Sequence, residues 1–175
     1  MVEEDEVMLV DENDQRIGRM PKMEAHIEGK LYRAFSIFIF NHSGELLLQQ
    51  RALDKYHSPG KRTNTCCSHP RPDESTLDAA KRRLEEEMNM ECELSPVFSF
   101  FYRTGVENGL LENEYDHVYF GRSDDLPYPN PLEVADFKYV SMQELKANLI
   151  VAQDEYTAWL KICFTEVMAC YLKWK

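Results

Sequence analysis

Short apolar runs separated by polar turns divide the start of the chain into strands. Residues 7–10 and a second run ending near Met20 flank the turn-forming residues 11–14, a pattern that predicts an opening β-hairpin. Pro21 is suited to the first turn of a helix, and residues 22–26 would form the body of that short helix. The chain is therefore expected to begin with a hairpin followed by one or two helical turns.

Aromatic and β-branched residues dominate the next segment. Residues 31–40 predict a strand, residues 41–44 a turn, and residues 45–50 the returning strand. Further along, alternation and turn signals predict strands at residues 98–103, 112–121 and 137–140.

Helix signals lie between and after these strands. Ser75 and Asp78 have the spacing of an N-terminal cap, and the apolar residues that follow recur at helical spacing up to Met88. Ser141 likewise predicts the start of a helix that reaches Leu149. Residues 154–174 predict a long amphipathic helix. Its apolar face would comprise Tyr156, Trp159, Cys163, Val167, Cys170 and Trp174, for which core packing is the simplest interpretation.

Between the strands and the first long helix lies an unusual stretch, residues 63–70, with the sequence Thr-Asn-Thr-Cys-Cys-Ser-His-Pro. In a strand, side chains alternate between faces, so Cys67 and His69 would point one way and Cys66 and Ser68 the other. A thiol beside a possible metal ligand is chemistry that a core strand does not need. The stretch is therefore a candidate reactive site.

Alternation also aligns three acidic residues on the strand at residues 112–121. Glu112, Glu114 and Asp116 fall on one face of it. Carboxylates aligned in this way form either a solvent-facing edge or a site for metal binding and proton transfer, and the pattern alone leaves both open.

A basic loop precedes the cysteine stretch. Arg51, Lys55, Lys61 and Arg62 lie within it. Such a cluster suits a small anion such as a diphosphate, although a merely solvated loop explains it equally well.

Composition and charge narrow the classes that this pattern allows. The 175 residues fit one domain, residues 1–175, and 43% apolar with 29% charged residues is typical of a soluble globular protein. The net charge of -11 argues against general nucleic-acid binding. No stretch approaches the ~20 apolar residues of a membrane span, and the opening Met1-Val2-Glu3-Glu4-Asp5 does not resemble a signal peptide. With five cysteines in no framework spacing, a cytoplasmic protein with reduced thiols is expected.

Around the first long helix, the residues follow a known signature. Ser68, Glu74, Arg82, Glu86, Glu87 and Met90 have the spacing of the Nudix motif G-x5-E-x7-R-E-U-x-E-E-x-G-U. Ser68 and Asn89 replace its glycines, and Arg83 replaces the first glutamate after the arginine. A cation in place of that glutamate weakens a hydrolytic metal site and provides a charge for a diphosphate.

The whole chain more closely resembles the type I isopentenyl diphosphate isomerases, which have the Nudix fold. The resemblance is carried by residues 22–26, 33–36, 48–52, 63–70 and 112–114 and by the late Trp159. It implies an α+β fold: a Nudix-type mixed β-sheet sandwiched between helices, with an N-terminal β-hairpin extension and a long C-terminal helix. It further implies a single small-molecule substrate, no nucleic-acid or membrane partner, and a monomer or weak dimer.

The resemblance implies a double-bond shift that converts isopentenyl to dimethylallyl diphosphate in isoprenoid biosynthesis. Protonation of the alkene gives a tertiary carbocation, and loss of a proton from the neighbouring carbon completes the shift. By resemblance, Cys67 and Glu114 are the proton-transfer groups, Tyr102 assists Glu114, and Trp159 faces the cation. The implied substrate-binding residues are Lys22, Arg51, Lys55, Ser68 and Arg83.

Two divalent ions are also implied. The resemblance places Mn2+ or Zn2+ on His26, His69, Glu112 and Glu114, and Mg2+ between Glu87 and the diphosphate. Most of the family has a third histidine where this chain has Tyr32, and a phenol is a poor metal ligand unless it loses its proton. The alternatives are a Nudix hydrolase of another diphosphate, which the Glu86–Glu87 pair favours, and a non-catalytic diphosphate-binding relative, which Tyr32 favours.

Overall fold

The computed structural model describes residues 5–174, so residues 1–4 of the opening segment discussed above lie outside the described residues. At its centre is strand β3 (Tyr32–Phe40), which is buried along almost its whole length. β3 pairs in parallel with β8 (Leu111–Arg122), whereas its pairings with β1, β4 and β6 are antiparallel. The sheet is therefore mixed. Its other strands are β1 (Glu6–Val10), β2 (Arg16–Pro21), β4 (Leu46–Arg51), β5 (Arg62–Thr63), β6 (Cys66–Ser68), β7 (Leu94–Gly105) and β9 (Val134–Val140).

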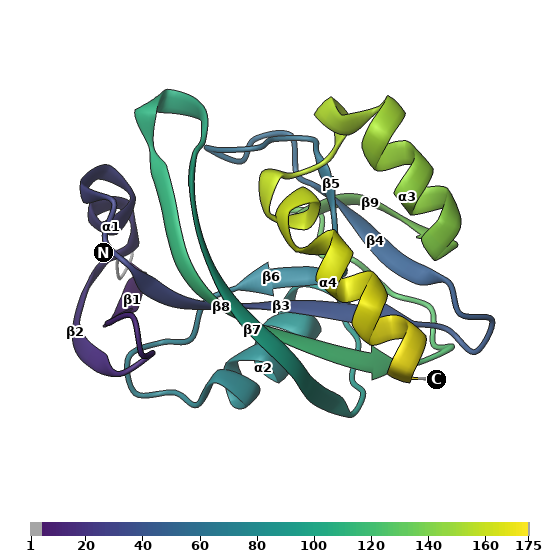
Figure 1. The fold of residues 1–175 in the computed structure, drawn as a ribbon, viewed down its shortest axis with the longest axis horizontal. Coiled ribbons are helices and arrows are strands. Elements are labelled where there is room, and N and C mark those ends of the chain that lie inside the picture. Colours follow the sequence, from purple (N-terminus) through teal and green to yellow (C-terminus); the bar gives the residue numbers. More distant parts are fainter. Residues whose placement is uncertain (1–4, 175) are drawn as a thin grey trace.

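Helices cover both faces of the sheet (Figure 1). Helix α2 (Thr76–Met88) buries Ala80, Leu84 and Met88 in one apolar cluster with β3. Helices α3 (Met142–Val151) and α4 (Ala158–Trp174) pack on a second cluster on the other side, and α1 (Lys22–Glu28) follows the β1–β2 hairpin. The predicted α+β fold, a mixed sheet between helices with an opening hairpin and a C-terminal helix, is confirmed.

Local sequence signals fix where α2 and α3 begin and where α2 ends. The Ser75 hydroxyl accepts a hydrogen bond from the Asp78 amide at 3.1 Å, and Ser141 does the same for the Glu144 amide at 3.1 Å. Asn89 ends α2 with φ 51°, in the left-handed region. The Nudix motif has glycine here, and asparagine is one of the few other residues that adopt this conformation readily.

Several predicted elements differ from the structure. The strands expected at residues 98–103 and 137–140 are longer, as β7 (Leu94–Gly105) and β9 (Val134–Val140). The last helix was expected from residue 154, but it begins at Ala158, after a 3-10 turn at Gln153–Glu155. The chain is extended between them because the Thr157 amide bonds to the Arg62 carbonyl at 3.0 Å. Residues 63–70 are also not one continuous strand. Pairing with β4 ends at Thr63, the last residue of β5, and pairing with β3 begins at Cys66, the first residue of β6. Between the two strands, the Asn64 side chain donates hydrogen bonds to the Ile37 and Cys66 carbonyls at 3.0 and 3.1 Å.

The long β7–β8 hairpin holds the basic loop in place. At its tip, the Glu107 carboxylate accepts from the Ser58 amide at 2.9 Å, and Asn108 donates to the Tyr56 carbonyl at 3.0 Å. The loop between β4 and β5 is thereby tied over the sheet. None of the helices described here is long and apolar enough to cross a membrane. That residues 1–175 form a single domain stays a prediction, which the one continuous sheet supports.

Candidate active site

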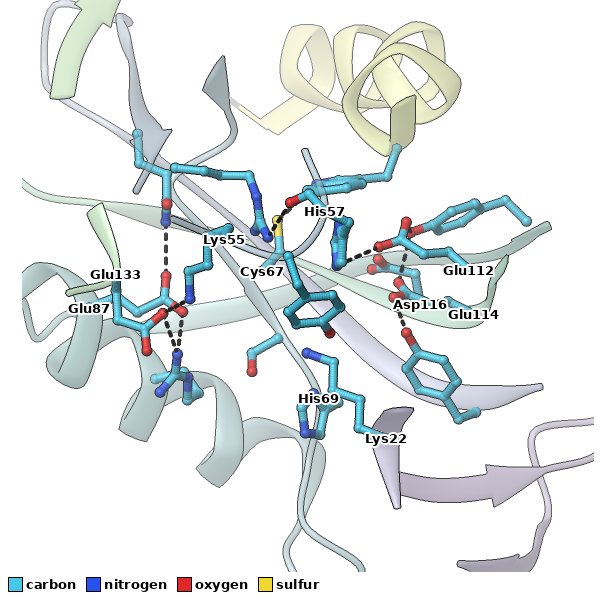
Figure 2. A pocket seen from close by; sticks show the side chains of 18 residues that line it. Lys22, Lys55, His57, Cys67, His69, Glu87, Glu112, Glu114, Asp116 and Glu133 are labelled. Atoms are coloured by element: carbon cyan, nitrogen blue, oxygen red, sulfur yellow. Dashed lines mark hydrogen bonds and ion pairs between the residues drawn. The ribbon is translucent and has the colours of Figure 1, made fainter. Parts of the chain in front are cut away.

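One pocket collects nearly all of the predicted site residues (Figure 2). It opens on the face of β3 that carries Tyr32 and Ser36, which are directly paired with Glu114 on β8 and with Cys67 on β6. Directly paired residues share a face, so the thiol and the carboxylate face the same side of the sheet. Of the predicted residues, the pocket is lined by Lys22, Arg51, Lys55, Cys67, Ser68, His69, Arg83, Glu87, Tyr102, Glu112, Glu114 and Trp159.

The two adjacent cysteines face opposite sides, as alternation predicted. Cys67 lines the pocket, where its sulfur accepts from Trp159 Nε1 at 3.1 Å and donates to Asn64 Oδ1 at 2.9 Å. Cys66 is fully buried on the other side, with its sulfur 3.4 Å from a Glu87 carboxylate oxygen. Burial, followed by the negative charge of Asp116, raises the pKa of Cys67 to about 12. Cys67 is therefore a neutral thiol at physiological pH, able to hold and donate a proton.

Two phenols hold the Glu114 carboxylate. Tyr32 Oη lies 2.6 Å from Glu114 Oε1, and Tyr102 Oη lies 2.8 Å from Glu114 Oε2 and 3.1 Å from Glu112 Oε2. Burial raises the pKa of Glu114, and burial together with the charge of Glu114 raises the pKa of Glu112 to about 8. Because removing a carboxylate from water favours its neutral form, this pair readily holds a proton near neutral pH. Burial also raises the pKa of both tyrosines, so they remain hydrogen-bond donors.

A third carboxyl, Asp116, lies on the same face and is 1% exposed. The Ser36 hydroxyl donates to Asp116 Oδ2 at 2.8 Å. Burial and then the nearby Glu114 raise the pKa of Asp116 well above its ordinary value. Sequence alternation placed Asp116 with Glu112 and Glu114, and the structure adds it to the pocket wall.

His57 is a pocket residue that the sequence interpretation missed. Its Nε2 lies 3.4 Å from Glu112 Oε1, and its ring packs edge-on against Trp159 with centroids 6.0 Å apart. Burial and then Arg51 lower the pKa of His57 to about 2, so the contact with Glu112 joins a neutral ring to the carboxyl and is not an ion pair. The only sequence signal was a histidine close to Lys55 in the basic loop.

The opposite end of the pocket is rich in cationic groups, and two of the arginines each have one N–H without a partner. Nε of Arg51 and Nε of Arg83 are buried with no hydrogen-bond partner among the described residues. Among the described residues, no carboxylate forms an ion pair with Lys22 or Arg51. Because a buried donor without a partner is costly, these N–H groups indicate a place for an anion.

Carboxylates pair with Arg83 and Lys55 at this end of the pocket. Arg83 Nη2 lies 2.5 Å from Glu87 Oε1 and 3.6 Å from Glu133, and Lys55 also pairs with Glu133. Gln49 donates to Glu87 Oε2 at 2.9 Å. Glu87 therefore lies at the anion end of the pocket with hard oxygen donors, the type of ligand that Mg2+ prefers beside a phosphate.

The residues predicted to bind Mn2+ or Zn2+ do not fit such an ion in this arrangement. No group of three or more histidine, cysteine or acidic side chains within residues 5–174 is placed to hold a metal. The Tyr32 hydroxyl lies between two of the four predicted ligands, 2.9 Å from His26 Nε2 and 2.6 Å from Glu114 Oε1. His69 lines the pocket, whereas His26 is fully buried beside it.

Comparisons with known proteins identify the domain family and the fold. The NUDIX domain family matches residues 30–160. A crystal structure of a Deinococcus radiodurans protein superposes with a TM-score of 0.77 at 22% identity, covering 92% of this chain and 98% of that one. The MutT protein from Methanosarcina mazei gives a TM-score of 0.64 at 17% identity, covering 78% of this chain and 91% of that one. These two structures share the fold.

Curated relatives narrow the class further. An Aromatoleum aromaticum protein named isopentenyl-diphosphate Delta-isomerase 1 is 54% identical over 95% of this chain and 94% of its own length. A Pectobacterium atrosepticum protein named isopentenyl-diphosphate Delta-isomerase is 51% identical over 93% of this chain and 90% of its own length. The chain therefore belongs to the NUDIX family and, within it, to the isopentenyl-diphosphate Delta-isomerase family. The resemblance stated from the residues is confirmed.

Proposed function

We propose that the protein isomerises isopentenyl diphosphate to dimethylallyl diphosphate by adding and removing a proton. One observation carries the proposal: a protonated thiol, Cys67, and a buried carboxyl, Glu114, open into the same pocket, whose other end has unpartnered arginine N–H groups. This arrangement provides two proton-transfer groups for the alkene and cationic donors for the diphosphate.

The proton balance defines the roles of these two groups. One of them gives a proton to the terminal alkene carbon, which creates a tertiary carbocation, and the other removes a proton from the neighbouring carbon. The substrate thus gains one proton and loses one, and the pair is reset by exchange with water. Tyr102 assists on the carboxyl side, since its hydroxyl is 2.8 Å from Glu114.

Trp159 stabilises the carbocation in this proposal. It lies in the first turn of α4, is 4% exposed, and donates its N–H to Cys67, which fixes the ring beside the thiol. An indole face attracts a cation more strongly when water is excluded. The edge-on packing of His57 against Trp159 helps to keep water from the cation.

The diphosphate is bound by the cationic end. Lys22, Arg51, Lys55 and Arg83 supply the charge, and Ser68 lines the same pocket. We place Mg2+ on Glu87, where the ion would neutralise the diphosphate oxygens when bound. A diphosphate would also satisfy the free Nε groups of Arg51 and Arg83.

The predicted Mn2+ or Zn2+ site comprises His26, His69, Glu112 and Glu114. An ion could bind there only if the Tyr32 hydroxyl moved away from His26 and Glu114. No step of the proposed mechanism is built on this ion. We further propose a cytoplasmic protein, a monomer or weak dimer without nucleic-acid or membrane partners. Analytical ultracentrifugation tests the oligomeric state.

Product analysis tests the proposed function. Purified protein with Mg2+ and isopentenyl diphosphate is expected to yield dimethylallyl diphosphate, whereas Cys67→Ala loses turnover. Cys170→Ala is the matched control, since this partly buried thiol lies on α4 and does not line the pocket. A Cys67→Ala variant with full activity would eliminate the role assigned to this thiol.

The Nudix hydrolase is the second candidate, because Glu86 and Glu87 match that motif. The Glu86 carboxylate is engaged by two arginines, however: it lies 2.7 Å from Arg83 and 3.1 Å from Arg82. Release of phosphate from a panel of nucleotide diphosphates would favour hydrolysis. Tight binding of isopentenyl diphosphate without turnover would favour a non-catalytic relative.

A further inference from the structure

We infer that Tyr32 is a positioning residue that holds the Glu114 carboxyl in the place of a divalent ion, so that the isomerase chemistry of this chain needs no metal at the histidine–glutamate cluster. The inference rests on the proposed function, and it assigns a role to Tyr32, where the resemblance implied a histidine ligand.

Tyr32 is placed to reach both of its partners. It is 1% exposed, and strand register sets it directly opposite Glu114 on β8. Its hydroxyl lies 2.6 Å from Glu114 Oε1 and 2.9 Å from His26 Nε2, which α1 carries into the same space. The phenol therefore fills the gap between an imidazole and a carboxylate, which an ion would need.

The Tyr32 hydroxyl engages one of the two ring nitrogens of His26. Nε2 lies 2.9 Å from Tyr32 Oη. The other nitrogen, Nδ1, is buried without a partner within the described residues. An ion bound between His26 Nε2 and Glu114 would therefore have to displace the phenol from both residues.

Tyr102 holds the Glu114 carboxyl from the side opposite Tyr32. Its hydroxyl lies 2.8 Å from the second Glu114 oxygen and 3.1 Å from Glu112. His57 Nε2 lies 3.4 Å from the remaining Glu112 oxygen. Each oxygen of the two carboxyl groups thus has a neutral partner, which orients both groups without a cation.

Because the Tyr32 hydroxyl holds the Glu114 carboxyl, Tyr32 affects the reaction through Glu114. Substitution Tyr32→Phe removes one hydroxyl and keeps the ring. Loss of a hydrogen bond to a carboxylate is expected to lower kcat by about 10- to 100-fold. KM for isopentenyl diphosphate should change little, because the cationic end of the pocket is untouched. A purely structural role would instead lower the melting temperature and leave kcat unchanged.

Tyr156→Phe is the matched control. Tyr156 is also 1% exposed, but it packs in the core cluster with α3 and α4 and does not line the pocket. Its loss of a hydroxyl should leave kcat unchanged. Tyr32→His supplies the opposite change, since an imidazole can ligate where the phenol cannot.

Metal counting tests the inference directly. The wild-type protein, Tyr32→Phe and Tyr32→His are incubated with Mn2+ or Zn2+, desalted and assayed for metal per chain. The wild type is expected to retain far less than one ion per chain and Tyr32→His close to one. Chelated wild type returned to Mg2+ alone should keep its activity.

Stoichiometric metal in the wild type, or an unchanged kcat in a folded Tyr32→Phe, would overturn the inference. Should Tyr32→Phe fail to fold, the metal content of the wild type still decides. Because metal is counted without turnover, this result is separable from a failure of the proposed isomerase activity.

Discussion

Replacing Arg51 with methionine should weaken diphosphate binding without destabilising the fold. Of the N–H groups of Arg51, Nη2 donates to the His57 carbonyl at 3.2 Å, while Nε is buried without a partner among the described residues. The guanidinium lies over the Trp159 ring, 5.4 Å from its centroid. Arg51 thus lines the pocket with one N–H that no described residue satisfies.

The expected magnitude follows from that one charged hydrogen bond. Such bonds contribute about 1.5–3 kcal/mol, which corresponds to a rise of about 10- to 150-fold in Kd for Mg2+–pyrophosphate, measured by calorimetry. The melting temperature should change little, because Arg51 is only half-buried and no carboxylate of the described residues pairs with it.

Two control variants separate charge from geometry. Arg51→Lys keeps the positive charge but loses the planar fork, so it should recover only part of the affinity. Arg16→Met changes the net charge equally at an exposed ion pair with Asp73, outside the pocket, and should leave Kd unchanged. An Arg51→Met variant that bound Mg2+–pyrophosphate as tightly as the wild type would refute the reasoning.

Three further outcomes are expected. Alkylation of Cys67 by iodoacetamide should be slow at neutral pH and rise about tenfold per pH unit into the alkaline range, since its pKa is raised to about 12; a plateau near pH 9 in mass-spectrometric rates would contradict this. The hydrogen bond from Arg82 lowers the pKa of Glu74, so this carboxylate stabilises the fold above its unfolded pKa of about 4.3 and the contribution is lost as pH falls. In Glu74→Gln, the melting temperature should therefore fall less steeply as the pH is lowered. An unchanged fall would contradict a stabilising role for the Glu74–Arg82 ion pair. Leu48→Ala, at a fully buried side chain of the core, should cost about 2–5 kcal/mol in urea unfolding, whereas a loss below about 1 kcal/mol would mean that the cluster repacks.

Predictions that depend on a few neighbouring residues succeeded. Ser75 and Ser141 identified the starts of α2 and α3 because a capping hydroxyl acts within three residues. Alternation separated Cys67 from Cys66 and aligned Glu112 with Glu114, because a strand has a fixed period. These local rules assigned each group to a face of its own strand, and the pairing of β6 and β8 with β3 then brought Cys67 and Glu114 to one side of the sheet.

Features set by distant contacts were not predictable from the pattern. Trp159 was grouped with a core stripe, but α4 starts later because Thr157 bonds to Arg62, far away in the sequence. His57 enters the pocket because the tip of the β7–β8 hairpin holds its loop through Glu107 and Asn108. Family resemblance, and not periodicity, gave the metal-site expectation, and the sequence did not indicate that the Tyr32 hydroxyl would lie between two of its ligands.

The most direct test of the central claim follows the reaction in deuterated water. Protein, Mg2+ and isopentenyl diphosphate are combined in D2O, and the products are read by NMR. Proton addition by the protein predicts dimethylallyl diphosphate with deuterium in the newly formed methyl group, at a rate that Cys67→Ala abolishes. Formation of inorganic phosphate, or recovery of the substrate unchanged and free of deuterium, would contradict the account.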